Sequence, residues 1–262
     1  MAALAVLVGV IAALRLARAA LLPVQFLSGW LLLAGMAVLA LYAVRKRLPA
    51  LPLGRAATWK HLHVNLGLFL LVVFAMHTRV RLPDGALDLS LGAAFLIVSL
   101  SGILGTILGH IVPPRLASVG EEVVYEQIPE LRRRLSEAVE KLVLGAVRET
   151  THATLADFYL QHLSEYFERP MFFWHHVAQY GRPWRNLIQA LDAQERFLSD
   201  AERQKAQQLR RLIQAKADLD YHYALQTMLK AWPFVHVPIT AALLILAAAH
   251  AAVVCWYHGG VL

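Results

Sequence analysis

The 262-residue chain is far more apolar than a soluble protein of its length, because 58% of its residues are hydrophobic and only 16% are charged, against about 25% charged in a typical globular domain. Residues 115–231 contain 16 of the 18 acidic residues and 16 of the 25 basic ones, so the rest of the chain carries the whole net charge of +7. Basic residues that flank apolar segments are typical of a membrane protein. This distribution excludes a nucleic-acid-binding protein, whose basic residues cluster on a soluble face.

Five hydrophobic segments have the roughly 20 residues that a helix needs to cross a bilayer. They are residues 2–22, 24–44, 61–80, 89–112 and 233–257. The first contains Arg15 and Arg18 and has no basic region before its apolar stretch, so we expect a retained helix and not a cleaved signal peptide. We expect Pro113 and Pro114 to stop the fourth segment and Pro233 to begin the fifth. The predicted fold class is all-α, an integral membrane helical bundle of about five transmembrane helices with an inserted soluble helical domain.

Basic residues near the ends of these segments predict the orientation. Residues 45–60 carry five bases and no acid, and Arg115 and Lys230 bring that side to seven, against four on the other. The positive-inside rule then places residues 45–60 and 115–231 in the cytoplasm of a bacterial inner (plasma) membrane. With this multi-pass topology the third and fifth segments run parallel, and the fourth returns between them.

The division predicted along the chain has three parts. Residues 1–114 form transmembrane helices one to four, residues 115–231 a soluble helical insert, and residues 232–262 transmembrane helix five. Within the insert, Ser199-x-x-Glu202 is a capping box, which predicts a helix from there to about Met228.

The first half of the insert is also expected to be helical. Residues 130–167 are amphipathic, with interruptions near Gly145 and Thr150-Thr151. Residues 169–184 contain an aromatic cluster, Met171 to His176 together with Trp184. Such a cluster packs the insert or rests at the bilayer surface, where Trp and Tyr are enriched.

Four histidines lie inside two apolar segments at matched spacing. His63 and His77 are fourteen residues apart in the third segment, and His236 and His250 are fourteen apart in the fifth. Fourteen residues are just under four helical turns, so each pair shares a face within about 40° and spans about 21 Å along the axis. Because the two helices are parallel, we expect His63 to face His236 at the cytoplasmic level and His77 to face His250 at the opposite level. Histidine inside a bilayer is costly and usually functional.

Two imidazoles on opposite sides of a metal are typical axial ligands of a b-type haem iron. The single cysteine, Cys255, excludes an internal disulfide and a cysteine-rich zinc or iron–sulfur site, and no C-x-x-C-H motif for covalently attached haem occurs. Zinc prefers four ligands, usually with a thiolate or carboxylate, and the five segments contain no carboxylate. We therefore expect two haem b groups, with His63, His236, His77 and His250 as the iron ligands.

Small and basic residues around the histidines suit a porphyrin. Gly67 lies one turn above His63. A stripe of small residues in the fourth segment permits close helix approach and consists of Ser101, Gly105 and Gly109. Four basic side chains lie at segment ends, where they can pair with haem propionates: Arg55, Lys60, Arg79 and Arg81.

At these residues the chain resembles di-haem membrane cytochromes b, and in particular the transmembrane domain of the ferric-reductase and NADPH-oxidase family. The resemblance covers residues 61–110 and 232–257, and it implies that the matched histidines ligate two stacked haems that pass electrons across the membrane. The chain departs from that family in three respects. It has no G-x-G-x-x-G motif, it lacks the family's flavin and nicotinamide domains, and the 117-residue insert is not a family feature.

Other histidines have competing interpretations. His61 is about 160° away from the His77 face, so we interpret it as an interfacial residue or as a propionate or quinone contact. His110, at the cytoplasmic end of the fourth segment, either lines a quinone pocket or simply ends the helix. Four further histidines are interpreted as packing or solvated residues, with a docking or quinone site open for the first two: His175, His176, His222 and His258.

The function expected from these observations is that of a membrane-embedded di-haem cytochrome subunit. It would carry electrons between a quinone pool and a protein redox partner, and quinone is a second candidate cofactor. Whether the chain is itself an enzyme stays open, with a quinol-linked oxidoreductase complex as the setting. One alternative is a haem-free membrane anchor or assembly subunit of a larger complex. Another is a histidine-lined transporter, which normally shows intramembrane carboxylates or paired broken helices.

Overall fold

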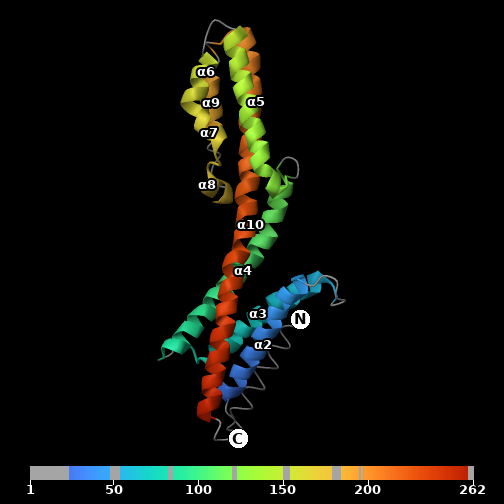
Figure 1. The fold of residues 1–262 in the computed structure, drawn as a ribbon, viewed down its shortest axis with the longest axis vertical. Coiled ribbons are helices and arrows are strands. Elements are labelled where there is room, and N and C mark those ends of the chain that lie inside the picture. Colours follow the sequence, from blue (N-terminus) through green and yellow to red (C-terminus); the bar gives the residue numbers. More distant parts are fainter. Residues whose placement is uncertain are drawn as a thin grey trace. The chain divides into compact units, whose positions relative to one another are not determined.

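The structure is a computed structural model, and it describes residues 24–47, 54–81, 85–119, 123–149, 154–178, 184–194, 196 and 198–258. The described residues form helices and loops without any strand (Figure 1). Their contacts divide the chain into two compact units, residues 1–108 with 232–262 and residues 109–231. The hydrophobic segment 2–22 lies outside the described residues. The all-helical fold class is confirmed.

Among the described residues, four helices are long and apolar enough to cross a membrane. They are α2 (Val24–Arg47), α3 (Ala56–His77), α4 (Ala86–Ala117) and α10 (Asp200–His258). Many apolar side chains on these helices are exposed, including Leu100 at 66% and Ile245 at 70%. Exposed leucine and isoleucine at this density suit a surface in contact with lipid. The chain is thus a membrane protein by the length and composition of its helices.

The membrane unit, residues 1–108 with 232–262, is held together by antiparallel helix pairs. Leu70 of α3 lies so close to Gly35 of α2 that a Cβ at this glycine would be 2.6 Å from the leucine side chain. Phe74 of α3 stacks on Phe95 of α4 with ring centroids 4.3 Å apart. These contacts build a core whose fully buried members are Leu32, Leu70, Val73, Phe95 and Leu243. Helices α2, α3, α4 and α10 all contribute to this core.

The prediction that Pro113 and Pro114 end the fourth segment is wrong. Helix α4 continues through both prolines to Ala117. A proline removes its own N–H and disturbs one carbonyl a turn earlier, but the residues after it can still donate to carbonyls behind them. The helix ends slightly later, where Ser118 N donates to Arg115 O at 3.3 Å in a tightened last turn.

Pro233 does not begin a helix either. Helix α10 runs without interruption from Asp200 to His258 and contains both Pro233 and Pro238. The predicted helix to Met228 and the predicted fifth span are therefore one element. Good helix-forming residues on both sides, Leu229 to Trp232 before Pro233 and the alanine-rich segment after Pro238, carry the helix past the missing donors.

The second unit, residues 109–231, consists of short helices packed on the first half of α10 (Figure 1). Its elements are a 3₁₀ turn (Tyr125–Gln127), α5 (Ile128–Glu149), α6 (Thr154–Phe158), a π-helical turn (Tyr159–Leu163), α7 (Ser164–Glu168), α8 (Phe173–Ala178) and α9 (Trp184–Gln194). Helix α5 is antiparallel to α10, since Glu149 pairs with Lys205 at its end and Glu126 pairs with Lys230 before its start. The insert is helical, as predicted.

The start of α10 confirms the capping box. Ser199 N and Ser199 Oγ both donate to Glu202 Oε2, at 3.0 and 2.9 Å, and Glu202 N donates back to Ser199 Oγ at 3.4 Å. The expected break near Gly145 is wrong, because α5 runs through it to Glu149. A Cβ at Gly145 would be 3.3 Å from Lys205 Nζ, so the glycine permits close helix approach. The expected break at Thr150-Thr151 lies outside the described residues.

The aromatic cluster of residues 169–184 divides between the core and the surface. Met171, Phe172 and Trp184 pack against the buried core of the second unit, whereas the Trp174 side chain is 72% exposed. His176 is buried at 8% exposure and lies edge-on to Tyr221. Packing of the insert therefore accounts for most of this cluster.

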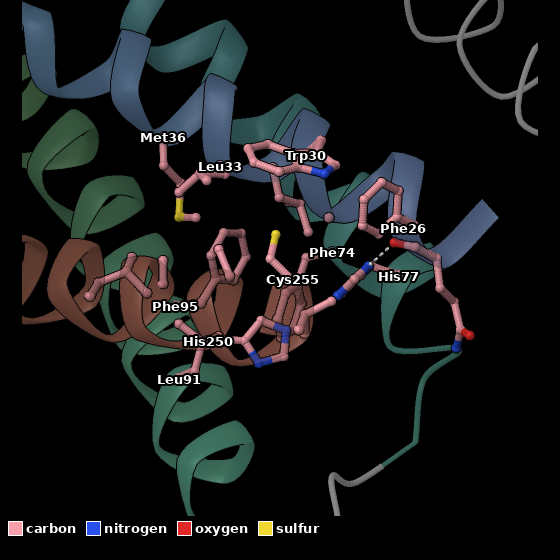
Figure 2. A pocket seen from close by; sticks show the side chains of 17 residues that line it. Phe26, Trp30, Leu33, Met36, Phe74, His77, Leu91, Phe95, His250 and Cys255 are labelled. Carbon is pink, nitrogen blue, oxygen red and sulfur yellow. Dashed lines mark hydrogen bonds between the residues drawn. The ribbon is translucent and has the colours of Figure 1, made fainter. Parts of the chain in front are cut away.

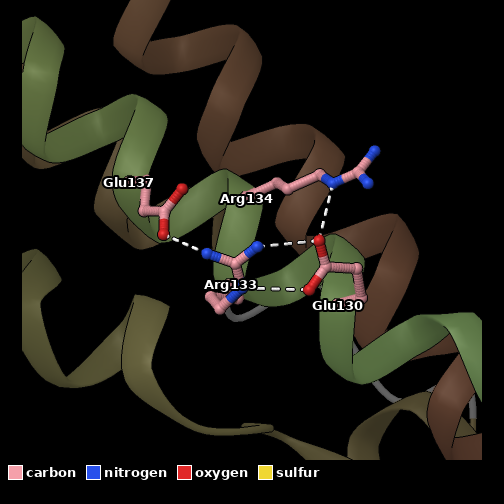
Figure 3. Close-up of polar contacts among 4 residues, drawn as sticks. All are labelled: Glu130, Arg133, Arg134 and Glu137. Atoms are coloured by element: carbon pink, nitrogen blue, oxygen red, sulfur yellow. Dashed lines mark hydrogen bonds and ion pairs between the residues drawn. The ribbon is translucent and has the colours of Figure 1, made fainter.

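The outer face of α5 carries an exposed ion-pair network (Figure 3). Glu130 accepts hydrogen bonds from Arg133 and from Arg134, and Arg133 also pairs with Glu137. The hydrogen bond from Arg133, followed by that from Arg134, lowers the pKa of Glu130 to about 2. Pairs so exposed contribute little to stability, so this network marks a solvated face.

Candidate functional site

The structure brings the four intramembrane histidines together in the predicted pairs. His77 of α3 and His250 of α10 line one cavity. His63 of α3 and His236 of α10 are near enough to interact electrostatically. All four rings are half-buried. Helices α3 and α10 therefore place their histidines at two levels of the membrane unit, which is what the matched spacing of fourteen residues predicts.

The His77 ring is held by α2. Its Nδ1 atom lies 3.0 Å from the carbonyl oxygen of Gln25 and 3.0 Å from Ser28 Oγ. Because a carbonyl only accepts, Nδ1 carries the proton and donates it. The α2 backbone also limits the ring from the side, since a Cβ at Gly29 would be 3.1 Å from His77 Cε1.

The His250 ring is held by α4. Its Nδ1 lies 2.7 Å from Oδ1 of Asp88, and this carboxylate is the acceptor. Helix α4 begins at Ala86, three residues before the predicted span, so Asp88 lies inside its first turn. The Asp88 carboxylate and the His250 ring also interact electrostatically with His77. This end of the bundle thus contains two imidazoles and one carboxylate.

Both rings of this pair line a cavity of about 310 Å³ (Figure 2). Figure 2 shows His77 and His250 at its edge with Trp30, Phe74 and Phe95 around them. Cavities that take organic cofactors begin at about 300 Å³ and are mostly apolar with few polar groups. The walls of this cavity are mostly aromatic and aliphatic side chains.

The His63–His236 pair is held in the same manner by the same two neighbouring helices. His63 Nδ1 lies 3.2 Å from the carbonyl oxygen of Leu39 in α2, and the ring packs on Tyr42 with centroids 5.1 Å apart. His236 Nδ1 lies 3.3 Å from Ser101 Oγ in α4, and Trp232 stacks on this ring at 5.0 Å. Each histidine is therefore fixed by a group on a neighbouring helix.

The nitrogen used in these bonds decides what the rings can bind. A neutral imidazole that donates through Nδ1 has its lone pair on Nε2, and metal-ligating histidines usually donate their other ring N–H to a carbonyl or carboxylate in this way. The carbonyl and carboxylate acceptors set this tautomer for His63, His77 and His250. The hydroxyl of Ser101 can act as donor or acceptor toward His236.

The other predicted site residues are placed less closely. Gly67 has open space beside it, since a Cβ there would meet no atom within 4 Å. Lys60 and Arg79 are exposed at opposite ends of α3, and neither lines the cavity. Arg79 has a left-handed backbone (φ 53°) just after the helix ends. Contact of these three residues with a cofactor stays a prediction.

Four other histidines among the described residues lie apart from the two pairs. His61 and His110 are exposed. His222 is buried in the second unit and donates through Nε2 to Val119 O at 2.9 Å, which supports the interpretation that its spacing from His236 is a coincidence. His176 is a packing residue, and its burial, with a smaller effect of Lys216, lowers its pKa to about 4.

Sequence reasoning missed the groups that hold the rings. Ser28, Asp88 and Ser101 each contact a paired histidine, as do two backbone carbonyls. The position of Asp88 could have indicated a partner. A carboxylate directly before an apolar segment must either pair with another group or remain in water. The backbone acceptors left no signal in the sequence.

Within the described part of the chain, no three or more His, Cys, Asp and Glu side chains gather as a metal site. Comparison of the chain with protein-family models, curated protein sequences and solved structures gives no match. The membrane unit with its two histidine pairs is therefore the basis of the functional conclusion.

Proposed function

We propose that this protein is a membrane-embedded b-type cytochrome that holds two haems and carries electrons across the membrane. The observation that carries the proposal is the pairing itself: α3 and α10 each supply one histidine to each of two pairs. Each pair would offer two imidazoles to one haem, with His77 and His250 holding one group and His63 and His236 the other. An iron bound there supplies one-electron redox chemistry.

The chain's own part is to bind, orient and shield. His77, His63 and His250 each donate through Nδ1 to a group on a neighbouring helix. Their Nε2 atoms, which would bind the iron, therefore point away from that helix. The walls around the His77–His250 cavity are mostly apolar, and a low surrounding dielectric is one of the properties that tune a haem potential. Fourteen helical residues separate the two levels by about 21 Å, a large part of the roughly 30 Å hydrocarbon core.

The setting we propose follows from the charges at the helix ends. Residues 45–60 and the second unit lie in the cytoplasm of a bacterial inner membrane, because the basic residues gather on that side. The chain works as a subunit, exchanging electrons with a quinone pool and with a protein redox partner, and the helical second unit is the surface for that partner. Reduction of the purified protein by a quinol tests the quinone link directly.

The decisive experiment measures haem per polypeptide in the purified full chain. Reduced-minus-oxidised spectra and pyridine haemochrome analysis are expected to give two b-type haems. His77→Ala and His63→Ala should each remove one. His110→Ala is the control, since His110 is exposed on α4 and belongs to neither pair, and it should retain two.

A haem-free membrane anchor is the second candidate, and one observation favours it. All four histidines make hydrogen bonds to another helix, which is what a structural role predicts. A colourless, folded preparation that stays without haem when haem is added would establish the anchor function. Retention of two haems by all four single alanine variants would equally contradict the haem-ligating role of the pairs.

A further inference from the structure

The two histidine pairs differ in one chemical respect. On the α3 side, both rings donate to backbone carbonyls of α2, at Leu39 and at Gln25. On the α10 side, His236 contacts the neutral hydroxyl of Ser101, whereas His250 contacts the carboxylate of Asp88. Ser28, which also lies 3.0 Å from His77 Nδ1, is neutral as well, so of these groups only Asp88 carries a formal negative charge.

A carboxylate at Nδ1 changes the metal that Nε2 binds. The hydrogen bond raises the basicity of the ring, so the ring donates more electron density to the metal. The charge also interacts directly with the iron centre, which gains a positive charge when it is oxidised. Both effects favour the ferric state and lower the reduction potential.

The position of Asp88 keeps its charge in place. Asp88 lies in the first turn of α4, where the helix dipole and free backbone N–H groups stabilise an anion. Its side chain is 48% exposed while His250 is 27% exposed, so the carboxylate reaches water on one side and the ring on the other.

Basic residues at the same end do not cancel this effect. Arg79 and Arg81 are exposed and line no part of the cavity. Charges in water are screened within about 10 Å at ordinary salt, whereas Asp88 is in direct contact with the ligand ring.

We propose that Asp88 is a positioning residue that makes the His77–His250 haem the lower-potential one of the two. Electrons then pass downhill from this pair to the His63–His236 pair. The electron donor therefore meets the protein at the Asp88 end. This inference rests on the proposed two-haem function and adds to it the direction of electron flow.

The first test is a potentiometric titration of the purified full-length protein and its Asp88→Asn variant, which removes the charge at nearly constant shape. The wild-type protein should titrate as two one-electron components. In the variant the reduction potential of the lower component should rise by at least about 59 mV, which is a tenfold larger ferrous-to-ferric ratio at the same applied potential. The reduction potential of the upper component should stay unchanged. Asp88→Glu should restore most of the wild-type value.

Ser90→Ala is the matched control for this titration. Ser90 Oγ donates only to Ala86 O within the same helix turn, and its side chain is exposed, so both potentials should be those of the wild type. An Asp88→Asn variant that retains two haems with unchanged potentials overturns the inference and leaves the two-haem function standing. Absence of haem in the wild-type protein overturns both.

A second measurement does not depend on the folding of any Asp88 variant. His77→Ala should remove the lower-potential component and His63→Ala the higher one. The opposite assignment, or a wild-type titration in which the two components have the same potential, overturns the inference.

Discussion

The indole ring of Trp232 lies directly over Gly105, where a Cβ would be 2.1 Å from the ring. The Trp232 Nε1 atom donates to Ser101 O at 2.8 Å, and the same ring stacks on His236. The small-residue stripe predicted in the fourth segment thus admits a tryptophan side chain of α10. Because the Trp232 ring stacks on His236, the stripe also sets the position of this paired histidine.

Replacement of Gly105 by alanine is therefore expected to destabilise the membrane unit. The rigid indole cannot retreat without losing its hydrogen bond and its stack, and such overpacking costs about 1–3 kcal/mol. Thermal unfolding in detergent measures the effect. The matched variant Gly92→Ala, whose Cβ would lie 3.7 Å from Phe74, should be as stable as the wild type or more stable by up to about 1 kcal/mol. Equal stability of both variants would contradict the packing of Trp232 described above.

A methyl group at Gly29 should act on the His77–His250 pair. At 3.1 Å from His77 Cε1 it forces the ring to shift by a few tenths of an ångström. Haem content of the Gly29→Ala variant is expected to fall toward one per chain, with the remaining haem at the other pair. Retention of two haems with unchanged spectra would show that the ring tolerates this displacement.

Gly67→Ala separates cofactor contact from protein packing. Nothing lies within 4 Å of the added methyl, so the free energy of unfolding should stay constant or rise by up to about 1 kcal/mol. If Gly67 faces a haem beside His63, haem binding at that pair weakens although the fold is intact. Comparison of haem content with thermal stability in the same preparation measures the two effects separately.

The buried pair Lys216–Asp220 should be essential to the second unit. Both side chains are almost fully buried; Lys216 also donates to Arg169 O at 2.9 Å, and Asp220 accepts from Met171 N at 3.1 Å. Removal of Asp220 leaves the buried Lys216 ammonium without its carboxylate, which costs about 3–5 kcal/mol. Removal of Lys216 should cost less, because Asp220 still lies 4.0 Å from Arg132.

A double-mutant cycle in urea measures this coupling. Lys216→Met and Asp220→Leu should each destabilise the second unit, Asp220→Leu more strongly, and the double variant should lose less than the sum of the two. Glu130→Gln is the surface control, for which no measurable change is expected. An additive cycle would mean that the two residues do not act as a pair.

The second unit should lose stability as the pH falls from neutral toward 4. Burial lowers the pKa of His176 from 6.5 to about 4, so between these values the unfolded chain binds a proton that the folded chain does not. Stability therefore falls with decreasing pH by up to about 1.4 kcal/mol per pH unit, and this contribution levels off below pH 4.

Hydrogen exchange of peptides from α5 and α9 at several pH values follows the second unit within the full chain. His176→Phe should reduce the pH dependence between 4 and 6.5, whereas replacement of the exposed His162 by glutamine should leave it unchanged. A pH profile that is identical in His176→Phe and the wild type would assign the effect to other groups.

Features with a local or periodic cause could be predicted from the sequence. Segment length and apolarity predicted α2, α3 and the membrane half of α10. The spacing of the histidines predicted that His77 and His250 lie at one level, where they line one cavity, and that His63 and His236 lie near each other. Both inferences follow from the constant rise and turn of a helix. The capping box at Ser199 was equally visible, because its two partners are three residues apart.

Only the tertiary structure showed which groups hold the histidine rings and that α4 and α10 continue through their prolines. Asp88 and His250 are 162 positions apart, and a contact between residues so distant depends on how whole helices pack. The same holds for Trp232 over Gly105. A proline predicts the end of a helix because it lacks a backbone N–H. In α4 and α10 the turns on both sides of the prolines keep enough hydrogen bonds for the helix to continue. The sequence by itself determined the elements and the register of their histidines, while the chemical surroundings of each histidine emerged from packing between helices.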